Sequence, residues 1–313
     1  MAGTSLYSVY RRTARAAAKQ QVVKKTSNID IERARTDFAY FCDVVGDKPP
    51  AAHHKEWHRY LCTDDNTECL VGIGGPNIDI LAPRGSAKST VLGLYTAWSI
   101  GVHALHKKPL KILYISYTVD VARPKSAAIK RIIEESKTYR EIFPMVKIAK
   151  GINSNEYWSI DWKFAGIKST GEEEFTICCA GLKGAVTSKR SHLCILDDVV
   201  KSADDIKNRD IRQMMEDNWN SVIVPTMFEG GRAICLGTRF RHDDIHNTTF
   251  TPVNDWVQIV QSAITVDNNG DEVSYWPEMW SLEYLQDRRR QAPISFSFQY
   301  QNQIVQTSDL SIS

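Results

Sequence analysis

The chain has 313 residues, 42% of them hydrophobic, which is enough for one large folded domain with a substantial core. Its 39 Lys and Arg residues nearly balance 37 Asp and Glu residues, and the net charge of +2 excludes a uniformly basic protein, so any affinity for nucleic acid must come from local patches. Seven cysteines without C-x-x-C spacing indicate reduced thiols in a cytosolic compartment, and no apolar run is long enough to span a membrane.

The N-terminal segment 1–36 predicts a basic arm. Its first thirty residues contain six Lys and Arg side chains and a single acid, Asp30, around an Ala-rich stretch that favours a helix. Two interpretations stay open: a solvated tail, or a surface helix that contacts a polyanion or a partner protein.

An aromatic and His-rich segment follows at 37–60. His54 and His58 have the i, i+4 spacing of a helical metal pair, but no glutamate stands where an H-E-x-x-H motif requires it. We therefore expect a helix that packs beside the loop described next, and no zinc site.

Residues 78–90, with the sequence IDILAPRGSAKST, predict a phosphate-binding loop between a strand and a helix. Lys88 supplies a charge for the β- and γ-phosphates of a nucleotide, and the Ser89 hydroxyl is placed for Mg²⁺. Ala82 and Ala87 stand where the motif has glycine, at a cost on the order of 1 kcal/mol for a left-handed alanine. Taken alone, the pattern fits a basic turn equally well. The residues expected to contact nucleotide are Pro83, Arg84, Gly85, Ser86, Ala87, Lys88, Ser89 and Thr90.

The remaining pattern alternates strands and helices. We expect strands at 78–82, 111–117, 175–180, 193–196 and 232–237, helices at 88–106, 119–137 and 204–222, and a hairpin within 153–164. Such alternation predicts an α/β fold with a mostly parallel central sheet and helices on both faces.

Two strand ends carry further candidate residues. The apolar run 193–196 ends in Asp197 and Asp198, and carboxylates at this edge of a parallel sheet point toward bound ligands. Asp197 is a candidate Mg²⁺ ligand with Ser89, and Asp198 is the candidate that orients or deprotonates the attacking water. An acidic turn after a core strand is the alternative.

The run 232–237 ends in Gly237, followed by Thr238 and Arg239. A hydroxyl and a guanidinium at a neighbouring strand tip are placed to respond to the γ-phosphate, so both are candidates for coupling hydrolysis to motion. By itself the pattern also fits a strand end with a turn glycine. His242, Asp243, Asp244 and His246 are explained more simply by an acid-capped helix start than by a metal site.

Together these strand ends resemble the large terminase subunit of tailed bacteriophages, the ATPase that drives DNA into preformed capsids. The resemblance covers roughly residues 50–305. It rests on 82–90, on 184–190 with the sequence GAVTSKR before the strand that ends in the paired acids, on 237–239, and on FQYQ at 298–301.

The resemblance implies a RecA-like (ASCE) P-loop NTPase with a core at 37–255 and a lid and linker at 256–313. In that family the phosphate loop is degenerate and carries an arginine, here Arg84, that senses or stabilises the γ-phosphate. A second arginine is expected to reach the site from a neighbouring subunit, and Arg123, then Arg131, are the candidates. Many related ATPases have glutamate at the position of Asp198, which leaves the identity of the base open.

The expected cofactors are ATP and Mg²⁺. The expected partners are double-stranded DNA held through its phosphates, the portal protein of the procapsid, the small terminase subunit and further copies in a homo-oligomeric ring, expected to be a pentamer, in the host cytoplasm. Large terminases usually continue into an RNase H-like nuclease, and this chain stops at Ser313, where that domain would begin, so we expect no DNA cleavage from it.

Two other functions fit part of the pattern. One is another RecA-like translocase or helicase, and the other is a nucleotide-binding module that no longer hydrolyses ATP.

Overall fold

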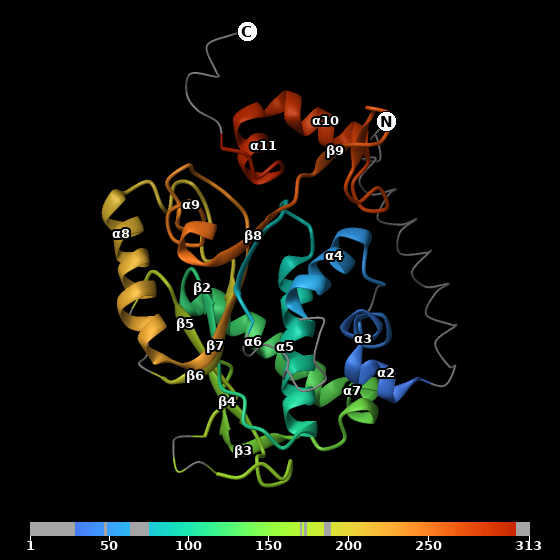
Figure 1. Cartoon of the computed structure of the whole chain (residues 1–313), viewed down its shortest axis with the longest axis vertical. Helices are drawn as coiled ribbons and strands as arrows, with labels where there is room; N and C mark the ends of the chain where they lie inside the picture. The colour runs from blue at the N-terminus through green and yellow to red at the C-terminus, as the bar shows by residue number, and fades with distance from the viewer. Residues whose placement is uncertain are drawn as a thin grey trace, which may run out of the picture.

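The computed structural model describes residues 29–46, 49–62, 75–169, 171, 174–184 and 189–304 (Figure 1). Most of the expected basic arm, residues 1–28, and the segment 185–188 of the GAVTSKR motif lie outside the described residues. No helix in the described ranges is long and apolar enough to cross a membrane.

A twisted sheet forms the centre of the molecule (Figure 1). It has eight strands in the order β3-β4-β5-β2-β6-β7-β1-β8. The strands from β5 to β8 in this order are parallel, and β3 and β4 form an antiparallel hairpin at one edge, so the predicted mostly parallel sheet is confirmed. The strands are β1 (Asn77–Leu81), β2 (Ile112–Ser116), β3 (Ile148–Asn153), β4 (Tyr157–Ile160), β5 (Ile177–Gly181), β6 (Ser191–Asp197), β7 (Met227–Gly237) and β8 (Trp256–Val260).

Helices cover both faces of this sheet because both faces of its strands are apolar. Along β2, Ile112 and Tyr114 belong to one buried cluster, whereas Leu113 and Ile115 belong to the other, as the two-residue repeat of a strand requires. The first face carries α2 (Ile31–Thr36), α3 (Phe38–Val45), α4 (Ala52–Leu61), α5 (Lys88–Leu105), α6 (Val119–Glu135) and α7 (Lys137–Ile142). The second carries α8 (Arg209–Asp217), a π-helical turn (Asn218–Ile223) and α9 (Ile245–Thr248), with 3₁₀ turns at Val224–Thr226 and Pro252–Asn254.

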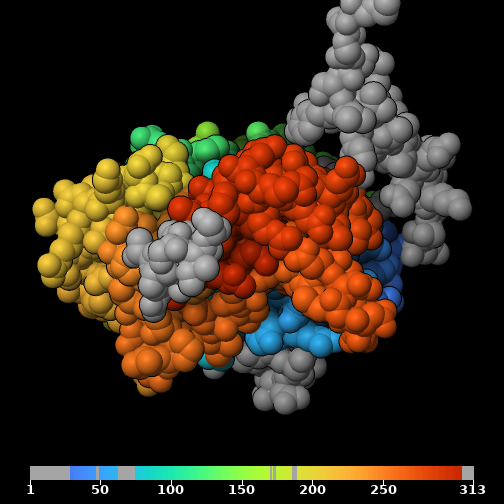
Figure 2. Space-filling model, turned by 90° about the horizontal axis from the view of Figure 1, so that it is seen from above, coloured from blue at the N-terminus to red at the C-terminus, as the bar shows by residue number. Residues whose placement is uncertain are grey.

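A small C-terminal unit lies over the carboxyl end of β1. It consists of β9 (Ile264–Val266), β10 (Glu272–Ser274), α10 (Leu282–Gln291) and α11 (Pro293–Gln299) around its own apolar cluster, and Figure 2 shows it from above in orange and red. We call residues 261–304 the lid.

The expected helix at 204–222 is wrong at its start. Ser202 and Asp205 hydrogen-bond to each other in a local turn, and the Asn208 side chain accepts the N–H of Asp210, so α8 begins only at Arg209.

Two contacts lie close to the expected boundaries of the arm and the core. The last strand of the sheet, β8, pairs with β1 beyond Asp255, so the sheet continues past the expected end of the core. At the other end, Trp98 Nε1 donates to the Ala34 carbonyl at 2.9 Å, so α2, in the last residues of the expected arm, packs on α5. The division into arm, core and lid stays a prediction.

Candidate functional site

The turn between β1 and α5 contains two left-handed residues. Gly85 has φ 78°, and Ala87 has φ 60° and ψ 26°, so the chain accepts the strain of about 1–2 kcal/mol that a left-handed alanine costs. Helix α5 then begins at Lys88 without a side-chain cap. Its first N–H groups are therefore free of a side-chain acceptor and favour an anion at this end of the helix.

Lys88 is buried beneath this turn, with only 7% of its surface exposed. Its Nζ donates to the carbonyls of Ala82 at 3.2 Å and Pro83 at 3.0 Å. Burial lowers the pKa of the ammonium, and the carboxylates of Asp198 and Asp197 oppose that shift. A phosphate would supply the negative charge that this buried cation favours.

Asp197 is fully buried at the end of β6, and each of its carboxylate oxygens has a partner. Ser89 Oγ donates to Oδ1 at 2.9 Å, Tyr114 Oη donates to Oδ2 at 2.7 Å, and Lys125 Nζ lies 3.0 Å from the same Oδ2. Burial raises the pKa of the carboxyl, and the Lys125 charge opposes the rise. The sequence placed Ser89 and Asp197 together but missed Tyr114 and Lys125, which reach the site from β2 and the first half of α6.

Asp198 differs from its neighbour in conformation and exposure. Its φ is 51°, its side chain is 39% exposed, and its Oδ2 lies 3.7 Å from Lys125 Nζ. The left-handed backbone lets the two successive carboxylates meet the same lysine from different directions. One acid is therefore held in the interior, and the other is open to a solvent molecule.

Helix α4 packs against the loop, as expected. His54 Nε2 lies 2.8 Å from the Ser86 carbonyl oxygen, and His53 Nε2 lies 3.5 Å from it. Burial and, to a smaller extent, the nearby His54 lower the pKa of His53 to about 3, and burial also lowers the pKa of His54, so both rings are neutral at pH 7. Both His54 nitrogens are engaged, since Nδ1 accepts the Ala51 N–H at 3.1 Å, which leaves no paired site for zinc with His58.

The lid contacts the tip of the loop. The Arg84 side chain donates to Gln299 Oε1 at 3.0 Å, its backbone N–H donates to the Gln299 carbonyl, and Trp280 Nε1 donates to the Gly85 carbonyl at 3.3 Å. A Cβ on Gly85 would lie only 2.6 Å from the Trp280 ring, so the close approach requires glycine. Beside these contacts, a cavity of about 260 Å³ lies between the loop and the lid, lined by Arg84 and Gly85 on one side and by lid residues on the other. Arg84 is directed toward the lid here, and its role at a γ-phosphate stays a prediction.

The two coupling candidates at the end of β7 contact different parts of the molecule. Thr238 Oγ1 donates to the Ala82 carbonyl at 3.1 Å, next to Lys88 Nζ on the same oxygen. Arg239 is buried, its backbone N–H donates to Asn302 Oδ1 at 3.0 Å, and its guanidinium donates to the Asn302 carbonyl. The strand tip thus touches the loop through one residue and the end of the lid through the next, and their part in coupling stays a prediction.

The two arginines that were expected to reach the site of a neighbouring subunit, Arg123 and Arg131, have different surroundings. Arg123 forms surface ion pairs with Asp120 at 2.5 Å and Glu156 at 2.8 Å. Arg131 lines a groove of about 690 Å³ between α3, α5 and α6, together with Ser89 and Lys125. Of these two arginines, Arg131 is the one that lines the groove beside Ser89 of the same chain.

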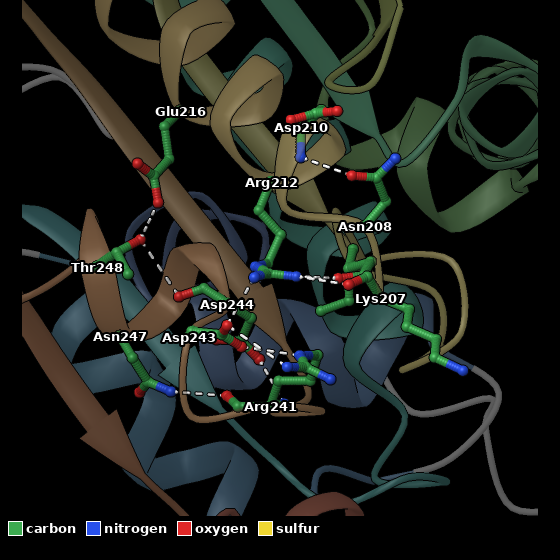
Figure 3. A network of polar contacts seen from close by, with 11 residues as sticks. Lys207, Asn208, Asp210, Arg212, Glu216, Arg241, Asp243, Asp244, Asn247 and Thr248 are labelled. Atoms are coloured by element: carbon green, nitrogen blue, oxygen red, sulfur yellow. Dashed lines mark hydrogen bonds and ion pairs between the residues drawn. The ribbon is translucent and has the colours of Figure 1, made fainter.

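The acids at 243 and 244 have structural partners (Figure 3). Asp243 pairs with Arg212 at 2.7 Å and with Arg241 at 2.8 Å. Asp244 Oδ2 accepts the backbone N–H of Phe240 at 2.9 Å, so it holds the turn before α9.

His246 lies in a buried site that the sequence did not predict. Its Nδ1 is 3.0 Å from Asp79 Oδ1, and with Cys235 the two residues place three potential metal-ligand atoms within 4.8 Å of one another. Burial alone would lower the pKa of His246, but Asp79 raises it, as an ion pair requires. Asp79 is 167 residues away in the chain, so no local pattern reveals this contact.

The fold is similar to solved phage structures. The large terminase of bacteriophage HK97 matches with a TM-score of 0.50 and 14% identity over 88% of this chain and 56% of that chain. The chain therefore shares its fold with that large terminase. This confirms the α/β fold with a mostly parallel, helix-flanked sheet that the resemblance implied.

Two other terminase structures match at similar scores. One is the large terminase of a thermophilic bacteriophage in complex with ATP-γ-S, with a TM-score of 0.49 and 8% identity over 80% of this chain and 52% of that chain. The other is a variant of the large terminase ATPase domain from Thermus phage P74-26. It matches with a TM-score of 0.48 and 16% identity over 85% of this chain and 98% of that chain. The chain spans about half the length of the first of the terminase structures it matches, 50% and 52%. No family model and no curated protein matches the sequence.

Proposed function

We propose that the chain is the ATP-hydrolysing motor domain of a viral DNA-packaging terminase, which moves double-stranded DNA into a procapsid. The observation that carries this proposal is the 2.9 Å hydrogen bond between Ser89 and Asp197, which joins the start of α5 to the end of β6 across β7. A hydroxyl and a carboxylate that meet beside a buried lysine form the donor set of a nucleotide-bound Mg²⁺.

In this proposal the loop residues 83–90 bind ATP. The N–H groups at the start of α5 and the Lys88 ammonium hold the phosphates, and Arg84 leaves Gln299 to meet the γ-phosphate. Mg²⁺ would be held by Ser89 and Asp197, and it would neutralise charge on the phosphates. Asp198, the exposed acid of the pair, orients or deprotonates the attacking water.

The assembly that we propose for this domain is the one that the resemblance to large terminases implies. Copies form a ring, expected to be a pentamer, docked on the portal protein in the host cytoplasm, with the small terminase subunit as a further partner. Arg123 of one copy, freed from its surface ion pairs, completes the site of the next copy. DNA is held through its phosphates. Because the net charge is only +2, these contacts come from local basic patches and not from a uniformly basic surface.

Phosphate release from ATP, measured with Mg²⁺, tests the proposal together with a matched pair of variants on α5. Ser89→Ala removes the hydroxyl that meets Asp197, and we expect hydrolysis to fall by about a hundredfold or more. Ser99→Ala removes a buried hydroxyl of the same helix, whose bond goes to the Tyr95 carbonyl at 2.8 Å, and should retain hydrolysis. Binding of ATP without any hydrolysis by the unaltered chain would favour the nucleotide-binding module instead.

A further inference from the structure

Lys125 occupies the place where a metal ion would meet the paired acids. Its Nζ lies 3.0 Å from Asp197 Oδ2, 3.0 Å from the Asp197 carbonyl oxygen and 3.7 Å from Asp198 Oδ2. The side chain is only 18% exposed, so this contact is held in the interior and is not a solvated surface pair. The ammonium is within hydrogen-bond distance of Asp197 Oδ2 and the Asp197 carbonyl oxygen and offsets part of the negative charge of the two acids.

This arrangement conflicts with a bound divalent ion. Asp197 Oδ2 already accepts a hydrogen bond from Tyr114 and lies 3.0 Å from the Lys125 ammonium, so a cation occupies this side of the buried acid. A Mg²⁺ ion needs an octahedral set of oxygens at about 2.1 Å, and it repels a neighbouring ammonium. A metal ion held by Ser89 and Asp197 would therefore compete with the Lys125 ammonium for the same acid.

The groove beside the site gives the lysine a direction in which to move. Lys125 lines the same groove of about 690 Å³ as Ser89 and Thr90, at the start of α5. On the proposed function, this is the end of α5 at which the phosphates of ATP would lie. A flexible four-carbon stem lets the ammonium turn from the carboxylates to those phosphates.

We propose that Lys125 exchanges partners during the cycle: it offsets part of the negative charge of Asp197 and Asp198 in the nucleotide-free protein, and it binds the terminal phosphate in the nucleotide-bound protein. The inference rests on the proposed nucleotide site. It adds to that site a cation from the same subunit, beside Lys88.

Lys125→Met tests this exchange, because methionine keeps much of the stem and removes the charge. Binding of Mn²⁺ to the nucleotide-free protein, followed by electron paramagnetic resonance, should become tighter by about tenfold or more, since the competing charge is gone. Binding of ATP-γ-S relative to ADP, measured by calorimetry with Mg²⁺, should become weaker by about tenfold, because only the triphosphate loses a partner. Lys130→Met is the matched control on α6, where Nζ lies 3.5 Å from the Asn153 carbonyl, and both affinities should stay at the wild-type values.

The opposite directions of the two effects separate the exchange from simple damage. An unchanged Mn²⁺ affinity, an unchanged ratio of ATP-γ-S to ADP affinity, or an equal loss of both nucleotides would overturn the proposal. If the variant is unfolded in EDTA, Mn²⁺ should restore its melting transition, and a failure to do so would also overturn it. A wild-type chain that binds neither Mn²⁺ nor nucleotide would refute the proposed function itself.

Discussion

Replacing Lys88 separates the proposed chemistry from the fold. Lys88→Ala removes two hydrogen bonds, to the Ala82 and Pro83 carbonyls, each worth about 1 kcal/mol. Neither carbonyl is left without a partner, because Ala82 O still accepts from Thr238 Oγ1 and Pro83 O from the Ser86 N–H. The variant also no longer buries an ammonium, which offsets part of the loss. We therefore expect the free energy of unfolding to fall by less than about 2 kcal/mol.

Hydrolysis should respond quite differently. Without a cation on the β- and γ-phosphates, the rate of phosphate release should fall by at least about a hundredfold. Urea unfolding and phosphate release are measured on Lys88→Ala and on Lys88→Met, which keeps most of the buried stem without the charge. Equal inactivity of both variants, with near-native stability, supports a phosphate-binding lysine. Wild-type turnover in Lys88→Met would refute the loop assignment, and unfolding of both variants would make Lys88 a core residue.

Three further outcomes are expected. Asp198→Asn should bind ATP with Mg²⁺ but hydrolyse it slowly, and calorimetry with phosphate release measures both; failure to bind, with normal binding by Asp197→Asn, would reverse the roles of the two acids. Arg123→Ala should spare nucleotide binding in the isolated chain and lose about a thousandfold of the rate in the assembled motor, and normal packaging by this variant would exclude Arg123. Burial lowers the pKa of His58 to about 4, so the native ring stays neutral while the unfolded chain takes up protons below about pH 6.5, and stability is lost as the pH falls from there toward 4. His58→Phe should remove about 2 kcal/mol of this loss between pH 7.5 and pH 5, and urea unfolding that falls equally in both proteins would contradict the assignment.

The parts of the site that were predictable from the sequence are those set by local chain patterns. The loop 82–90 and the acids after 193–196 follow apolar runs, and in a parallel sheet the ends of such runs meet at one edge. Ser89 and Asp197 are therefore neighbours, although 108 positions separate them.

The parts that were missed depend on side chains that reach across elements. Tyr114 lies within β2, where its pattern is that of any core residue, and only the pairing of β2 with β6 brings its hydroxyl to Asp197. Lys125 is one of two lysines on α6, and the sequence does not show which of them faces inward. The contact between His246 and Asp79, on the opposite face of the sheet, was missed for the same reason.

The late strand β8 was hidden by a different cause. Its residues 256–260 form a short edge strand in which only Trp256 is buried. Nothing local shows that it pairs with β1 and extends the sheet beyond Asp255.

The rate of ATP hydrolysis by the chain with Mg²⁺, measured with and without double-stranded DNA, tests the central claim most directly. The account predicts slow hydrolysis by the isolated chain, because the arginine from a neighbouring copy is missing, and a faster rate when DNA gathers several copies on one duplex. Absence of hydrolysis under both conditions, in a folded chain that binds ATP, would contradict the account.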